Sequence, residues 1–205
     1  MDTLAKLLGG QARIKIMRLF LLNPEQAFEI EDIVGRSRVQ RAGTRKEINA
    51  LLSVDFIKQK TITKEGSRGG KKRVNVWILN SNFQYLNPIK DLLIDPEVIM
   101  QDDLVDKLRP IGKVGLMVVA GVFIGRDDSR ADLMIVGDRI KRNVLNQVIK
   151  SLESEIGKEL NYVVFDTEEY MYRLSMYDKL VCDILDYPHI KLFENPKLST
   201  YTSKK

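Results

Sequence analysis

The chain has 205 residues, 44% of them hydrophobic, and this length suits one large or two small domains with a substantial core. The single cysteine, Cys182, excludes an internal disulfide, and a Cys/His zinc site is not expected because His189 is the only histidine. No apolar run is long enough to span a membrane and the first residues carry charges throughout, so we expect a soluble, cytoplasmic protein without a membrane partner.

Positive charge is concentrated in the first half of the chain. Residues 1–95 hold 17 Lys and Arg against 10 Asp and Glu, whereas residues 96–205 hold 16 against 18, so the net charges are +7 and −2. This asymmetry indicates an anionic polymer as the partner of the first half alone. Chance asymmetry on a soluble surface is the alternative interpretation.

The first predicted helix covers residues 11–22, QARIKIMRLFLL, and ends before Pro24. Helical spacing gives it an inner side of four apolar residues: Ile16, Met17, Phe20 and Leu21. Lys15 and Arg18 fall on the opposite side of this helix.

Residues 31–57, EDIVGRSRVQRAGTRKEINALLSVDFI, predict two short helices joined by a tight turn and followed by a strand. Spacing of three and four residues gives the second helix an apolar face: Thr44, Ile48, Leu51 and Leu52. The same spacing gathers small, basic and amide side chains on another face: Ala42, Arg45, Lys46 and Asn49. Such a helix suits the major groove of DNA, although an ordinary solvated basic face has the same pattern.

A β-hairpin is predicted next, with strands at residues 56–63 and 74–79. The intervening residues 64–73, KEGSRGGKKR, are rich in glycine and predict a flexible, cationic tip. A mobile basic tip beside a basic helix suits contact with phosphates or a minor groove. The alternative is a hairpin whose lysines only protect exposed strand edges.

Residues 4–79 resemble the winged helix-turn-helix domains of bacterial and archaeal transcriptional regulators. The resemblance rests on LLGGQARIKIMRLFLLNP, on TRKEINALLSVDFIKQK and on the basic hairpin, and Gly43 in the first turn of the second helix departs from it. It implies that the second helix reads bases in the major groove while the wing contacts the backbone or minor groove. The predicted DNA-binding residues are Arg36, Arg38, Gln40, Arg41, Ala42, Arg45, Lys46, Asn49, Lys64, Arg68, Lys71, Lys72 and Arg73.

The predicted domains are residues 1–95 and 104–195, separated by a linker at 96–103 and followed by a flexible tail at 196–205. Pro88 begins a further short helix of the first domain, and residues 104–108 form another. In the second domain we expect strands at 115–124, 132–136, 160–165 and 190–193, and helices at 142–156 and 168–185, the latter capped by Thr167. The whole chain is therefore expected to be α+β, with a small mixed sheet in its second domain.

Residues 121–138, GVFIGRDDSRADLMIVGD, are similar to the core of the minimal nucleotidyltransferases of the DNA polymerase beta superfamily. That family uses a glycine-serine turn and three carboxylates that hold two metal ions. Here Val122 replaces the serine, Arg130 the first acid and Asn161 the last, so only Asp132 matches. We therefore expect the fold without transferase activity, catalytic residues, metal or cofactor, and Asp132 as a solvent-exposed acid at a strand start. A shifted turn using Asp127 or Asp128 is the alternative placement.

The sequence thus favours a sequence-specific, double-stranded DNA-binding transcriptional regulator acting as a homodimer. The second domain would dimerise or sense an effector, with Cys182 in its core and His189 structural. A divergent nucleotidyltransferase and an interaction protein of the toxin–antitoxin type stay open as alternatives. The DNA target, the direction of regulation, the effector and the dimer surface do not follow from the sequence.

Overall fold

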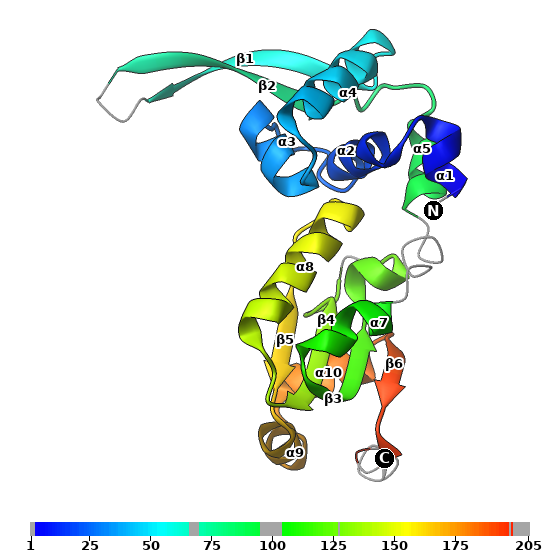
Figure 1. The fold of residues 1–205 in the computed structure, drawn as a ribbon, viewed down its shortest axis with the longest axis vertical. Helices are drawn as coiled ribbons and strands as arrows, with labels where there is room; N and C mark the ends of the chain where they lie inside the picture. The colour runs from blue at the N-terminus through cyan, green and yellow to red at the C-terminus, as the bar shows by residue number, and fades with distance from the viewer. Residues whose placement is uncertain (1–2, 66–69, 95–103, 127, 197, 199–205) are drawn as a thin grey trace. The chain divides into compact units, whose positions relative to one another are not determined.

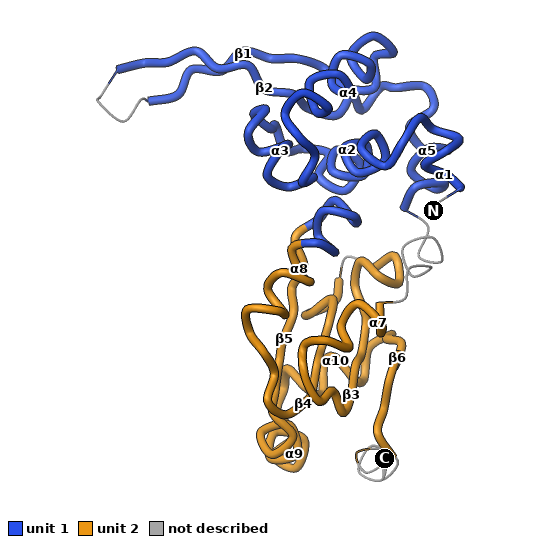
Figure 2. Tube along the Cα trace, in the orientation of Figure 1, with its two compact units in different colours: residues 1–94, 151–158 blue, residues 95–150, 159–205 orange. Residues whose placement is uncertain are grey.

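The computed structural model describes residues 3–65, 70–94, 104–126, 128–196 and 198, and the fold is α+β as the sequence predicts. The chain forms two compact units (Figure 2). Unit 1 comprises residues 1–94 and 151–158, and unit 2 comprises residues 95–150 and 159–205. The predicted linker lies outside the described residues. No described helix is long and apolar enough to cross a membrane.

Unit 1 is built from helices and one β-hairpin around an apolar core (Figure 1). The described helices are α1 (Thr3–Leu8), α2 (Gln11–Leu21), α3 (Ile30–Ser37), α4 (Arg41–Ser53) and α5 (Leu86–Leu93). The start of α3 is stabilised by a hydrogen bond from the Glu29 amide to Asp32 Oδ2 at 3.0 Å. Helix α5 begins two residues before the predicted start at Pro88, so Pro88 lies in its first turn. Proline is tolerated there because a residue of the first turn has no helical acceptor for an N–H, which proline lacks.

Helix α2 lies in the middle of unit 1. The prediction that Lys15 and Arg18 form its outer side is wrong for Arg18. Arg18 is only 8% exposed, and its Nε donates to the Leu93 carbonyl at 2.9 Å. The periodicity of α2 could not show this, because the covering residue is 75 positions away in the chain. A buried guanidinium requires such acceptors, so Arg18 belongs to the structural interior of unit 1.

The hairpin consists of strands β1 (Ile57–Glu65) and β2 (Lys71–Leu79), which pair antiparallel over their whole length. It extends beyond the helices of unit 1 (Figure 1). The strands are longer than predicted, because pairing continues out to Glu65 opposite Lys71. The prediction that the cations lie in a flexible tip is therefore wrong for four of them, which lie within the paired strands: Lys64, Lys71, Lys72 and Arg73. Arg68 lies outside the described residues.

Unit 2 contains a four-stranded mixed sheet in the order β5-β4-β3-β6. The strands are β3 (Lys113–Val119), β4 (Leu133–Asp138), β5 (Tyr162–Phe165) and β6 (Ile190–Glu194). Strands β4 and β5 run parallel, and the other pairs are antiparallel, which confirms the predicted mixed sheet. Helices α7 (Leu104–Leu108) and α8 (Arg142–Ile156) have the predicted bounds.

Two elements near this sheet differ from the prediction. The strand expected at 115–124 ends at Val119, and Gly121–Ile124 forms a 3-10 turn, η2. The helix expected at 168–185 is two helices, α9 (Thr167–Ser175) and α10 (Lys179–Asp186). The chain breaks where Tyr177 takes a φ of 53°, and the Asp178 side chain then accepts the Leu180 and Val181 amides. The cap of α9 is Asp166 rather than Thr167.

The prediction of a flexible tail from residue 196 onward is wrong at Leu198. Leu198 is buried in the core of unit 2, and its amide donates to the Asn195 carbonyl at 2.8 Å. A side chain buried against the sheet fixes the backbone around it, which composition alone does not show. Residues 197 and 199–205 lie outside the described residues.

The same core holds Tyr170, whose burial gives a pH prediction. The Tyr170 hydroxyl is buried and has no hydrogen-bond partner among the described residues. Burial, with a smaller effect from the charge of Glu194, raises the pKa of Tyr170 to about 12. In the unfolded chain this phenol ionises near pH 10, so the folded state loses stability between about pH 10 and 12, by ~1.4 kcal/mol per pH unit. In denaturant unfolding, Tyr170→Phe should flatten that decline, and an unchanged slope would contradict the assignment.

Candidate nucleic-acid interface

Helix α4 has the two faces that its spacing predicts. Thr44, Ile48 and Leu51 are buried on one side. The other side is exposed and carries Ala42, Arg45, Lys46 and Asn49. The cationic and amide groups of α4 therefore point away from the core of unit 1, where a partner can reach them.

The inner side of α4 is held by polar contacts as well as by apolar packing. Glu47 is 7% exposed, and its Oε2 accepts from Arg13 Nε of α2 at 2.7 Å. Arg13 also donates to the Leu8 carbonyl at 3.2 Å, which links α1 to the same pair. This ion pair links α4 to α2. Local spacing does not indicate the pair, since the two residues are 34 positions apart.

The turn between α3 and α4 is compact. Arg38 ends α3 in the left-handed conformation, with a φ of 55°, and its side chain is exposed. The Thr44 hydroxyl donates to the carbonyls of Val39 and Gln40, each at 3.2 Å. A Cβ on Gly43 would lie 3.3 Å from Val39 Cγ1, so a larger residue here would require the Val39 side chain to shift by a few tenths of an ångström.

Two predicted DNA-binding cations are bound to acids at the start of α3. Arg41 pairs with Glu31, and Lys64 of the hairpin pairs with Glu29. The hydrogen bond to Glu29, followed by the charge of Glu29, raises the pKa of Lys64. An anionic partner must compete with these carboxylates. Neither pair is local in the sequence, since the partners are 10 and 35 positions apart.

The remaining predicted residues are placed as follows. Arg36 is half-buried with its guanidinium carbon 5.3 Å from the centre of the Phe28 ring, so it is less accessible than expected. Gln40 is the exposed residue preceding α4. The hairpin exposes Lys71, Lys72 and Arg73, together with two lysines that we did not include: Lys58 and Lys60.

Asp132 of unit 2 is not the solvent-exposed acid that we predicted. It is 7% exposed, its Oδ1 accepts the Val122 amide and its Oδ2 accepts the Asn161 amide, both at 2.9 Å. A Cβ on Gly121 would lie 2.0 Å from Oδ1, so the chain packs closely around this carboxylate. Asp132 thus joins the η2 turn to the start of β5, and its oxygens serve the backbone.

The other positions of the nucleotidyltransferase-like segment are also occupied by protein contacts. Arg130 pairs with Asp183 of α10 at 3.0 Å, and Asp128 pairs with Arg126 at 3.1 Å. Asp127 lies outside the described residues. Among the residues that the structure describes, no three His, Cys, Asp or Glu side chains are grouped to hold a metal ion.

Cys182 and His189 have ordinary surroundings. Cys182 is half-buried on α10. His189 Nδ1 lies 2.9 Å from the Tyr187 carbonyl, a local contact within the loop before β6. The half-buried position of Cys182 differs from the core position that we predicted, whereas the local contact of His189 agrees with a structural role.

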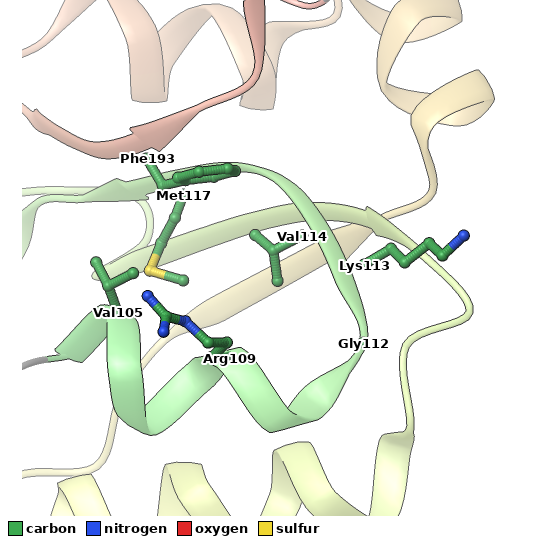
Figure 3. A pocket seen from close by; sticks show the side chains of 7 residues that line it. All are labelled: Val105, Arg109, Gly112, Lys113, Val114, Met117 and Phe193. Atoms are coloured by element: carbon green, nitrogen blue, oxygen red, sulfur yellow. The ribbon is translucent and has the colours of Figure 1, made fainter.

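A small pocket of about 350 Å³ opens beside strand β6 of unit 2 (Figure 3). It is lined by Val105, Arg109, Gly112, Lys113, Val114, Met117 and Phe193. The Arg109 head lies by Val105 and Met117 (Figure 3). The same guanidinium pairs with Asp106 at 3.0 Å. The rest of the lining is largely apolar, and the Lys113 side chain points away from the other labelled side chains (Figure 3). The pocket therefore suits a small apolar molecule better than an anionic one.

No protein-family model matches the chain, and no curated protein sequence matches it significantly.

Proposed function

We propose that this protein is a sequence-specific, double-stranded DNA-binding transcriptional regulator. The observation that carries the proposal is the exposed face of α4, where Arg45, Lys46 and Asn49 lie opposite a buried and ion-paired face. The major groove is about 12 Å wide and admits one helix. Arginine pairs with guanine and asparagine with adenine at the base edges of that groove, so α4 carries side chains that can read sequence.

The hairpin supplies the sequence-independent part of the proposed interface. Its exposed lysines neutralise phosphates of the backbone or reach the adjacent minor groove, and each neutralised phosphate releases counterions. This division of labour, in which phosphate contacts position the protein and base contacts specify the site, is general among DNA-binding proteins.

Unit 2 would serve dimerisation or sensing in this proposal. A homodimer would present two copies of α4 to paired half-sites. The pocket beside Phe193 offers a place for a small, largely apolar effector. Nucleotidyl transfer is not proposed, because both oxygens of Asp132 accept backbone amides and Arg130 is paired with Asp183.

Selection of bound sequences from a pool of random duplex DNA tests the proposal directly. We expect enrichment of a defined sequence, and tighter binding to it than to random duplex when both are measured at the same salt concentration. A pool that stays random, or equal affinity for both duplexes, would show that sequence-specific recognition is absent.

The ion pair between Arg41 and Glu31 yields a charge prediction. Glu31→Gln should raise the affinity for duplex DNA by roughly 3-fold, and the dependence of log K on log salt should steepen by up to about 0.9, because Arg41 becomes available to a phosphate. Glu25→Gln is the matched control, since it removes the same charge from an exposed position that has no cation bound to it among the described residues. Equal effects of the two substitutions in a salt titration would show that the pair does not compete with DNA.

A further inference from the structure

The pairing register gives the hairpin two chemically different faces. In an antiparallel pair, residues opposite each other share a face and alternate residues of one strand lie on opposite faces. Lys58, Lys60, Ile62 and Lys64 therefore share one face with their partners, which are Ile78, Val76, Val74 and Lys72. We call this the lysine face. Its charges are all ammonium groups, which bind phosphates as point charges and carry little information about bases.

The other side of the hairpin, between the core and the tip, has no lysine until Lys71. Pairing places Thr61 opposite Asn75 and Thr63 opposite Arg73, and Gln59 lies on the same side. This side also holds Trp77, which is opposite Gln59 and packs against the core, and Glu65, which is opposite Lys71 near the tip. We call five of these residues, all of them exposed, the polar face: Gln59, Thr61, Thr63, Arg73 and Asn75. Asparagine is depleted in strands, so Asn75 in the middle of β2 is not explained by strand propensity.

The Thr61–Asn75 pair holds an amide in a defined orientation. The Thr61 hydroxyl donates to Asn75 Oδ1 at 3.2 Å. An amide oxygen has two lone pairs, so Oδ1 retains one, and the two donors of Nδ2 have no hydrogen-bond partner in the described part of the chain. An acceptor and a donor side by side match N6 and N7 of adenine in the major groove.

The spacing and chemistry of the polar face fit base edges. Alternate residues of a strand are about 6.8 Å apart, which equals two base-pair steps of about 3.4 Å. Arg73 suits guanine, Gln59 suits adenine and the threonine methyl groups suit thymine, and a two-stranded ribbon fits the width of the major groove. A solvated hairpin face would need none of these matches.

We infer that the polar face of the hairpin reads base edges in a major groove, with the Thr61–Asn75 pair recognising adenine, while the lysine face binds phosphates. This inference rests on the proposed DNA-binding function and goes beyond it, because the hairpin then contributes specificity as well as affinity. The interface would read sequence at two places, α4 and the hairpin.

The test uses the full chain and the duplex selected by the wild type. Asn75→Ala should weaken binding to that duplex by about 10-fold, with less than about 2-fold change on random duplex, and a repeated selection should lose one adenine. Thr61→Val keeps the shape of Thr61 and should give a smaller loss at the same base pair. Lys60→Ala on the lysine face is the control: it should weaken both duplexes equally and reduce the salt slope by about 0.9.

Base analogues identify the groove. Replacing that adenine by 7-deazaadenine removes N7, and should weaken wild-type binding while leaving Asn75→Ala unaffected. A selected sequence that is the same for Asn75→Ala as for the wild type, or an Asn75→Ala effect equal on both duplexes, would overturn the inference while leaving the proposed function intact. Unchanged binding of the wild type to the duplex with 7-deazaadenine would likewise overturn the inference.

Failure of the wild type to select any sequence would remove the proposed function and the inference together. Thermal unfolding of each variant should match the wild type, because the substituted side chains are exposed.

Discussion

Replacing Arg45 and Lys46 together by alanine should weaken binding to the selected duplex by about 2–4 kcal/mol, roughly 30- to 900-fold, with little loss of fold. Both side chains are exposed on α4, and neither takes part in the buried face that joins this helix to unit 1. Alanine is the best helix former, so the helix itself should persist. Specific binding should fall further than binding to random duplex, since side chains that contact bases are removed together with charge.

The measurement is a shift assay at fixed salt, with a thermal melt of each variant. Lys6→Ala with Lys90→Ala is the matched control, because it removes two exposed cations from α1 and α5 and changes the net charge equally. We expect the control to weaken both duplexes to the same small extent. If the two double variants behave alike, α4 contributes only general charge and is not the element that reads the site.

Asp132→Ala should destabilise unit 2 by about 2–4 kcal/mol, because two backbone amides lose their acceptor inside the fold. Asp128→Ala is the control: Asp128 is exposed and its pair with Arg126 lies at the surface, so little change in stability is expected. Calorimetric unfolding of the full chain measures both. A small loss for Asp132→Ala would show that its two hydrogen bonds are dispensable.

The same pair of variants separates a structural from a chemical role for Asp132. With ATP or GTP and Mg²⁺ present, we expect no shift in the melting temperature of the wild type and no incorporation of labelled nucleotide. Metal-dependent transfer that disappears in Asp132→Ala, with the fold retained, would instead establish the nucleotidyltransferase alternative. The geometry opposes that outcome, since both carboxylate oxygens are within 2.9 Å of backbone nitrogens.

The local pattern of the sequence was sufficient for several elements that bury one side. The bounds of α7 and α8 and the two faces of α4 follow from a period of 3.6 residues. These features depend on neighbours within a few positions, which is the range that a single sequence displays. The exposed side of α4, on which the proposed function rests, is among them.

Contacts between distant residues determined the rest. Arg18 has helical spacing typical of an outer position, yet Leu93 covers it, and Glu47 is paired with a residue 34 positions away. Most of the cations predicted to lie in a flexible tip lie in paired strands, because antiparallel pairing extends to Glu65 and Lys71. Composition records which side chains a segment contains, whereas register decides which of them share a face. The two faces of the hairpin, and the carboxylate of Asp132 enclosed by backbone amides, therefore emerge only when separate segments are brought together.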